Sequence, residues 1–222
     1  MSWFEPINLY CERTSSSFWA EPVNALTNIA FLVAAAAAFV LWRRSEGRDP
    51  LTAGLIAVTA LVGIGSFAFH TLATRGAVLL DVIPIALFVY LYLYLALRRF
   101  LNLRLGVTVS ILAAFIVFSR ALSWVVPPNF LNGSHEYLPP LAALIIVGLL
   151  VKTNHIRRSI LLAAAVFLIS LALRTIDKAV CSGFPIGTHF VWHVLNAVVL
   201  YILLRTAVLA AKESGLRHIR GA

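Results

Sequence analysis

The sequence predicts an all-α membrane protein, a bundle of about seven transmembrane helices with the N-terminus outside and the C-terminus in the cytoplasm. Composition is the first reason, because 61% of the 222 residues are hydrophobic and only 12% are charged. A soluble domain of this length has roughly twice that charged fraction. The second reason is that apolar runs near the ~20 residues needed to cross a bilayer as a helix recur along the chain. The third is that the basic residues cluster at alternate ends of these runs.

The first four apolar runs follow one another with short connections. The first run comes after segment 1–21, which contains three glutamates and lacks the basic start and short apolar core of a cleaved signal peptide. We therefore expect the first helix to be an uncleaved membrane anchor. The expected helices in this half of the chain span 22–42, 51–70, 77–97 and 103–126.

The last three apolar runs follow the longest connection, 127–137, which is rich in turn-forming residues. It contains Asn132 in a glycosylation triplet of a kind that also occurs by chance, and His135, which we expect to be solvated. The expected helices span 138–151, 159–173 and 186–211, of which the first two are the shortest. Because the connections are short, we expect a single transmembrane domain over 1–222, with an outer segment 1–21, a bundle 22–211 and a cytoplasmic tail 212–222.

The placement of the basic residues predicts the orientation of the bundle. Most of the 18 Lys and Arg residues fall between the first and second, third and fourth, and fifth and sixth helices, or at the C-terminus. They are Arg43, Arg44, Arg48, Arg98, Arg99, Arg104, Lys152, Arg157, Arg158, Arg205, Lys212, Arg217 and Arg220. The positive-inside rule places these connections in the cytoplasm. The net charge of +9 therefore indicates topology and not a nucleic-acid partner.

The two cysteines fall on the same predicted side of the membrane. Cys11 precedes the first helix and Cys181 lies between the sixth and the seventh, so both are expected outside, where disulfides persist. We expect a Cys11–Cys181 bond that ties the N-terminal segment to the last outer loop. The alternative is a pair of unpaired thiols.

Five polar residues in or next to the apolar runs form the candidate site. His189 and His193 are four residues apart and share a helix face, as do Ser66 and His70, while Asp81 lies near the start of the third helix. The predicted topology brings all five to one depth, beneath the outer surface. Ionisable groups in a membrane are costly unless they are paired, hydrated or metal-bound. Three imidazoles, a carboxylate and a hydroxyl match the needs of a catalytic zinc site with an open water position.

Each of these residues also has a structural interpretation when it is considered alone. A histidine near a helix end is usually interfacial or hydrogen-bonded within the core. Ser66 can bond a backbone carbonyl, and Asp81 can be a charge stabilised by the helix dipole. The shared depth of all five residues favours a metal site over these separate explanations.

Four sequence motifs match a known family, and they run in order over nearly the whole chain. They are Tyr10-Cys11-Glu12; Phe18-Trp19-Ala20-Glu21-Pro22-Val23-Asn24 with Asn28; Gly65-Ser66-Phe67-Ala68-Phe69-His70 followed by Asp81; and Cys181 followed by His189-Phe190-Val191-Trp192-His193 with Asn196. With these motifs the chain resembles the alkaline ceramidases, within a wider group of seven-helix membrane hydrolases that includes the adiponectin receptors and the GPI-anchor remodelling hydrolases.

The resemblance implies a role for each residue of the candidate site. His70, His189 and His193 would bind zinc, with a water molecule as the fourth ligand. Asp81 would be the general base, and Ser66 would lie beside the metal, where it could donate to a developing oxyanion. The reaction implied is hydrolysis of the amide bond of a ceramide-like N-acyl lipid to a fatty acid and a sphingoid base.

The resemblance also implies a calcium ion near the N-terminus. Glu12, Glu21 and Asn24 would supply oxygen ligands, which calcium prefers. The chain departs from the family pattern at Leu9, where an acidic residue is expected, and at Thr14, where an asparagine is expected. The alternative is that Glu12 and Glu21 are simply solvent-facing, with Glu21 at a helix N-terminus.

Other functions remain open from the sequence. One is a non-enzymatic seven-helix receptor or transporter that uses the polar cluster for ligand or proton binding, although no internal repeat of the kind common in transporters is visible. Another is a hydrolase of a different acyl lipid, because esters and amides need the same chemistry. The short loops favour a bacterial inner-membrane protein with its active site toward the periplasm.

Overall fold

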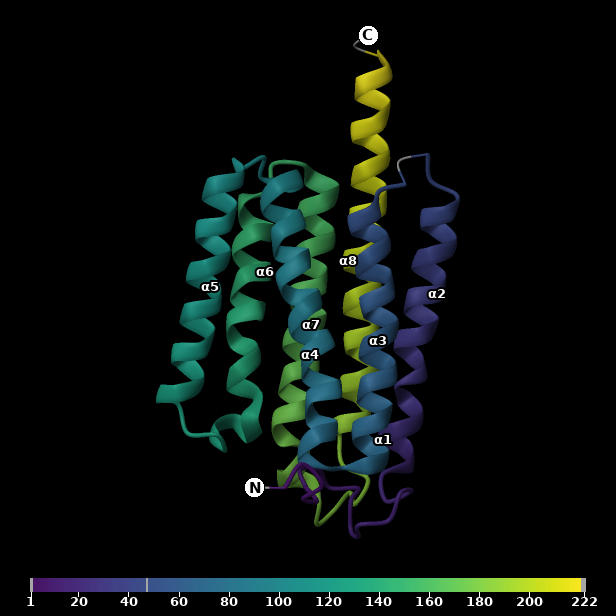
Figure 1. Cartoon of the computed structure of the whole chain (residues 1–222), viewed down its shortest axis with the longest axis vertical. Helices are drawn as coiled ribbons and strands as arrows, with labels where there is room; N and C mark the ends of the chain where they lie inside the picture. Colours follow the sequence, from purple (N-terminus) through teal and green to yellow (C-terminus); the bar gives the residue numbers. More distant parts are fainter. Residues whose placement is uncertain (1, 47, 221–222) are drawn as a thin grey trace.

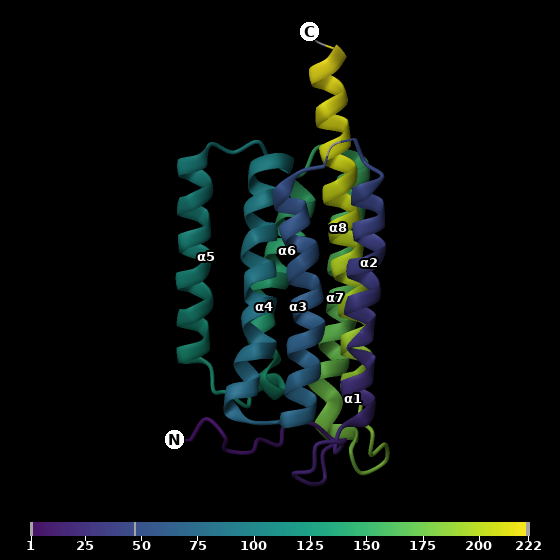
Figure 2. The same cartoon turned by 45° about the vertical axis from the view of Figure 1, so that its right-hand side comes forward.

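The computed structural model describes residues 2–46 and 48–220, and helices dominate this part of the chain (Figures 1 and 2). The helices are α1 (Pro22–Thr27), α2 (Ile29–Arg43), α3 (Pro50–Leu72), α4 (Arg75–Leu95), η1 (Ala96–Phe100), α5 (Leu105–Val125), η2 (Phe130–Tyr137), α6 (Leu138–Leu150), α7 (Asn154–Val180) and α8 (His189–Arg220). Among the described residues, seven helical segments are long and apolar enough to cross a membrane. The predicted seven-helix fold is therefore confirmed.

Two of the seven segments differ most from the expected boundaries. The sixth is the 27-residue helix Asn154–Val180, far longer than 159–173, because both polar ends of the apolar run are also helical. The fifth begins at Phe130, since η2 leads directly into α6. Within η2, His135 is only 2% exposed, so its assignment to a solvated connection was wrong.

Side-chain caps define where α3 and α4 begin. Asp49 accepts a hydrogen bond from the Thr52 N–H (2.9 Å), and Pro50 occupies the first helical position, where its missing N–H has no cost. Thr74 accepts from the Ala77 N–H (3.2 Å) at the start of α4. The turn between these helices is short, so α3 and α4 pack as an antiparallel pair.

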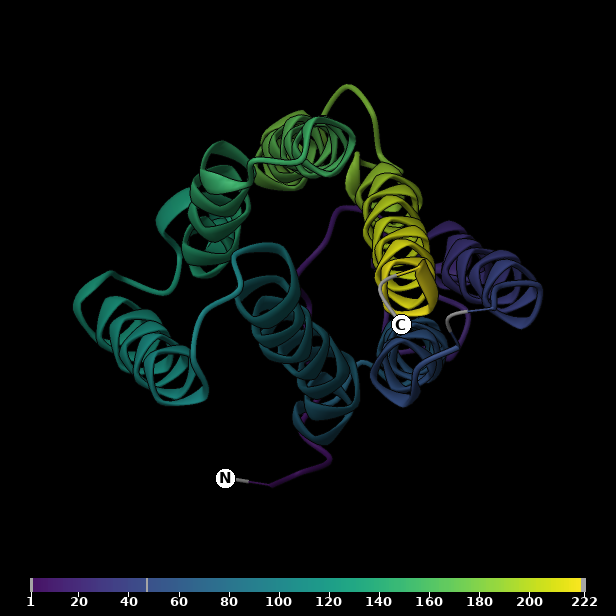
Figure 3. The same cartoon turned by 90° about the horizontal axis from the view of Figure 1, so that it is seen from above.

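The helices surround a common interior, as the view along the bundle shows (Figure 3). Buried residues of α2, α3, α4, η1, α6, α7 and α8 form the main apolar core, while α5 lies at the periphery and is the least buried span. The N-terminal segment, the α3–α4 turn and the α7–α8 loop lie together at one end of the bundle, and the C-terminus projects from the other (Figure 1). In the predicted tail 212–222, α8 continues to Arg220, and the last two residues lie outside the described part.

Candidate metal centre

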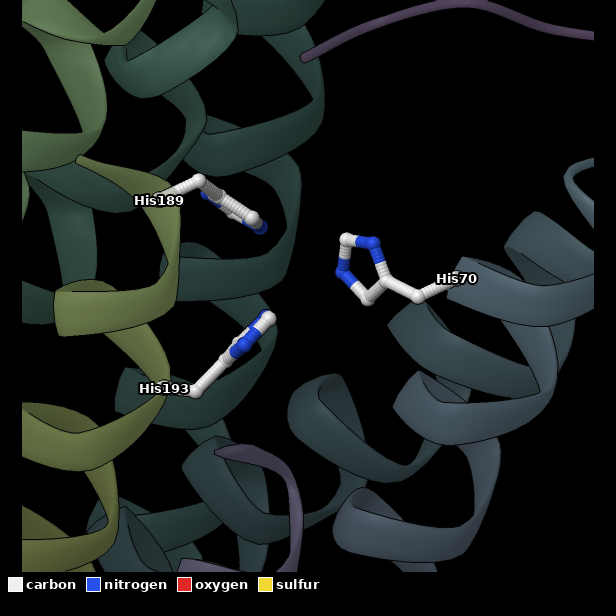
Figure 4. Close-up of side chains that lie close together, drawn as sticks. All are labelled: His70, His189 and His193. Carbon is white, nitrogen blue, oxygen red and sulfur yellow. The ribbon is translucent and has the colours of Figure 1, made fainter. Parts of the chain in front are cut away.

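Three buried histidines from α3 and α8 converge near the N-terminal end of the bundle. The imidazoles of His70, His189 and His193 point toward one another (Figure 4), and one nitrogen from each lies within 4.8 Å of the others. His189 and His193 occupy the first two turns of α8, and the i, i+4 spacing places both on the face that meets His70. All three are at most 2% exposed. The structure thus brings together the three histidines that the sequence singled out.

The hydrogen bonds of these histidines leave nitrogens free for a metal. His70 Nε2 and His189 Nδ1 are buried without a hydrogen-bond partner among the described residues. The other nitrogen of His70 contacts a Glu21 carboxylate oxygen at 2.6 Å, and His193 Nδ1 contacts the Thr27 hydroxyl at 3.0 Å. Buried polar atoms without partners are costly, and metal-bound histidines are usually held through their second nitrogen. The three histidines therefore fit a metal of the zinc type.

Ser66 and Asp81 meet where α3 and α4 approach most closely. A Cβ built on Gly65 would lie only 1.9 Å from the Leu80 carbonyl oxygen, so the absence of a side chain allows the two backbones to touch. Ser66 follows Gly65 on α3, and Asp81 follows Leu80 on α4. Ser66 donates a hydrogen bond to Asp81, whose charge also interacts with His70. All five residues of the predicted site are therefore gathered at one end of the bundle.

The predicted calcium ligands have other partners. Glu21 is buried and accepts hydrogen bonds from His70 Nδ1 (2.6 Å), Arg13 Nε (2.5 Å) and the Asn24 amide (3.2 Å). Burial alone would raise the pKa of the Glu21 carboxyl, but the hydrogen bonds and charges of His70 and Arg13 lower it. Both oxygens of Glu12 accept backbone N–H groups at the start of α1, at 2.7 and 2.8 Å. Neither glutamate is simply solvent-facing. Of the side-chain oxygens on the three predicted calcium ligands, only Asn24 Oδ1 is without a partner among the described residues.

Cys11 and Cys181 form a disulfide, with their Cα atoms 5.3 Å apart, as expected from their placement. Beside it, the buried Asp177 accepts hydrogen bonds from the backbone N–H groups of Cys11 (3.0 Å), Thr188 (2.7 Å) and His189 (2.9 Å). One carboxylate therefore holds both the N-terminal segment and the first turn of α8. This role of Asp177 was not among the sequence predictions, because its three partners are backbone N–H groups.

Tyr10 was also missed as a site residue. Its ring stacks on the His189 imidazole, with centroids 3.5 Å apart and planes 14° from parallel. Burial raises the pKa of Tyr10 to about 12 despite the nearby charge of Arg174, so the side chain remains a neutral phenol. Arg174 itself lies over the rings of Tyr137 and Trp192, and donates to the Asn132 carbonyl and the Ser134 hydroxyl, both at 2.9 Å.

An apolar cavity, partly open to the surroundings, lies next to the histidines. Its lining includes side chains of α4, η2, α6, α7 and α8, among them Phe88, Tyr137, Phe167, Trp192 and Asn196. The Trp192 ring is 6.5 Å from the His189 ring, so the cavity adjoins the metal centre. From Trp192 to Leu203, the cavity follows α8 for about 16 Å.

The fold and the site together define a seven-helix membrane protein with a buried histidine centre beside an apolar cavity. A sequence model of the ceramidase family matches residues 8–217, which is nearly the whole chain, and the protein therefore belongs to this family. A search of curated proteins found no match. Membership confirms the family resemblance and implies a hydrolase that acts on the amide bond of a lipid.

Proposed function

We propose that this protein is a zinc-dependent intramembrane hydrolase that cleaves ceramide-like N-acyl lipids to a fatty acid and a sphingoid base. The observation that supports it best is the histidine triad of a ceramidase-family chain, with two buried nitrogens that lack partners among the described residues. Three neutral imidazoles and a fourth, open position are the usual protein contribution to a catalytic zinc site. When bound, zinc would supply a water with its pKa lowered to roughly 7 and would polarise the amide carbonyl.

Asp81 is suited to the proton transfers of this reaction. As general base it takes a proton from the attacking water, and as general acid it passes that proton to the amide nitrogen. The C–N bond then breaks, the hydroxyl oxygen remains on the acyl carbon, and the amine leaves as the free sphingoid base. Ser66 donates a hydrogen bond to Asp81 and thereby orients the carboxylate. It can donate to the developing oxyanion only when it turns away from Asp81.

The apolar cavity is suited to a long hydrocarbon chain of the substrate. Its lining is almost entirely aliphatic and aromatic, and it extends along α8 from Trp192, beside the histidines, to Leu203. A lipid with one chain in this cavity would place its polar linkage near the metal centre. In the predicted topology the site faces the outer, periplasmic leaflet, from which a lipid can enter sideways. Family membership favours this function over a receptor or a transporter.

Metal analysis and product analysis test the proposal. We expect the purified protein to contain one zinc per chain and the His189→Ala/His193→Ala variant to contain none. The wild type should release a fatty acid and a sphingoid base from an N-acyl sphingosine, as detected by mass spectrometry. Matched O-acyl lipids test whether an ester is the better substrate. A folded wild type that is fully active without metal would refute the zinc mechanism.

A further inference from the structure

Arg13 and Glu21 form an ion pair that is almost completely buried. Arg13 Nε lies 2.5 Å from Glu21 Oε1, and the two side chains are 3% and 2% exposed. Burying two charges costs free energy that their attraction often fails to recover. A buried pair of this kind in a short outer segment therefore calls for a role beyond stability.

The same pair contacts His70 at two points. Glu21 Oε2 accepts from His70 Nδ1 at 2.6 Å, and Arg13 donates through its terminal NH2 group to the His70 backbone carbonyl at 2.8 Å. The guanidinium also donates to the carbonyls of Ser15 (3.2 Å) and Ser17 (3.3 Å). Arg13 thus connects the N-terminal segment to both the imidazole and the backbone of one predicted metal ligand. Carboxylates that hold a metal-bound histidine typically contribute 10–100-fold to metal affinity or activity.

The residues around this pair do not fit a calcium ion. Calcium takes six to eight oxygen ligands, of which carboxylates are the strongest. Glu21 is already shared by Arg13 and His70, and both oxygens of Glu12 accept backbone N–H groups. Of the side-chain oxygens on the predicted calcium ligands, only Asn24 Oδ1 lacks a partner among the described residues. A divalent cation at Glu21 would also lie against the Arg13 guanidinium. The positive charge beside Glu21 is therefore the Arg13 guanidinium and not a bound ion.

We propose that Arg13 is a positioning residue that replaces calcium in this protein and, through Glu21, holds His70 ready to bind the metal. Its guanidinium neutralises Glu21, fixes the orientation of the carboxylate and leaves the second carboxylate oxygen to accept from His70 Nδ1. His70 Nε2 then points into the centre. This inference rests on the proposed zinc site, and it predicts a protein that needs no calcium.

Zinc affinity tests the inference, with competition by a chromogenic chelator as the measurement. We expect Arg13→Met to weaken zinc binding about tenfold, the lower end of the effect of removing such a partner. Arg13→Lys keeps the charge but loses the forked donor geometry, so we expect a smaller loss. Arg75→Met is the matched control, because Arg75 pairs with Glu5 at the same end of the bundle and is 44% exposed. We expect no change in zinc affinity there.

Calcium titration of the zinc-loaded wild type completes the test. We expect no shift in melting temperature and no bound calcium up to about 10 mM, above the range of weak calcium sites. Zinc affinity unchanged in both Arg13 variants would overturn the positioning role, even if their melting temperatures fell. Stoichiometric calcium binding by the wild type would overturn the replacement of calcium. A wild type without zinc would instead refute the proposed function, which keeps the two failures distinct.

Discussion

Replacing Gly65 by alanine should separate α3 from α4 at the point that brings Ser66 and Asp81 together. The added Cβ would lie 1.9 Å from the Leu80 carbonyl oxygen and 2.7 Å from its carbon. Both atoms belong to the backbone, so no side-chain rotation can relieve the clash. An ordinary contact begins near 3.4 Å, so the two helices must move apart locally by about 1.5 Å.

This displacement sets the expected size of the effect. Overpacking a core by one methyl group typically costs about 1–3 kcal/mol. A separation of 1.5 Å is also enough to break the Ser66–Asp81 hydrogen bond, and misplacing a catalytic group by ~1 Å can lower the rate about 100-fold. The three histidines come from α3 and α8, whereas Asp81 comes from α4. Moving α4 away from α3 should therefore affect zinc binding much less than turnover.

Thermal unfolding, zinc content and turnover of an N-acyl sphingosine should therefore be measured on the same Gly65→Ala preparation. Gly54→Ala is the matched control, since it lies on the same helix and a Cβ there would meet nothing within 4 Å. We expect the Gly54 variant to be as active and at least as stable as the wild type, because alanine favours a helix over glycine. Wild-type stability and turnover in Gly65→Ala would refute the reasoning that this close backbone contact positions Asp81.

Three further changes give separate tests. Asp81→Asn should keep its zinc, as measured by metal analysis, yet lose turnover by at least about 100-fold, the usual contribution of a general base; full activity would refute that role. Replacing both Cys11 and Cys181 by serine should destabilise the protein by about 2–4 kcal/mol, seen as a lower melting temperature; an unchanged value would contradict it. Burial would raise the pKa of Asp49, but hydrogen bonds from Arg99 and Thr52 lower it below the usual 3.8. The ionised Asp49 carboxylate therefore stabilises the fold at neutral pH, and this stabilisation is lost as the pH falls below about 4. The gap in melting temperature between the wild type and Asp49→Asn should therefore close on acidification, and a gap that does not change with pH would argue against this contribution.

The bundle and the position of its histidines could be predicted because they depend on coarse properties. Seven apolar runs define seven spans, and alternate helices must begin and end on the same side of the membrane. That constraint alone brought His70 at the end of one helix to the level of His189 and His193 at the start of another. The i, i+4 spacing then placed two imidazoles on one face.

The N-terminal segment could not be predicted in the same way. It has no helical periodicity, so nothing in its sequence indicates that Arg13 turns inward to Glu21. Asp177 presents the same difficulty, because its three partners are backbone N–H groups, which leave no trace in the sequence. The length of α7 was underestimated because hydropathy detects only the apolar part of a helix, and polar residues extend it at both ends.

The N-terminal segment therefore belongs to the site as much as the helices do. Cys11 is tied covalently to Cys181 and by its N–H to Asp177, which also holds the first turn of α8. On one side of Cys11, Tyr10 stacks on His189. On the other side, Arg13 contacts the His70 backbone directly and the His70 imidazole through Glu21. The N-terminal segment thus helps to position two of the three histidines, and Thr27 on α1 contacts the third. Metal-ligand geometry that depends on a loop needs such ties, because a loop without them would be too mobile to orient a ligand.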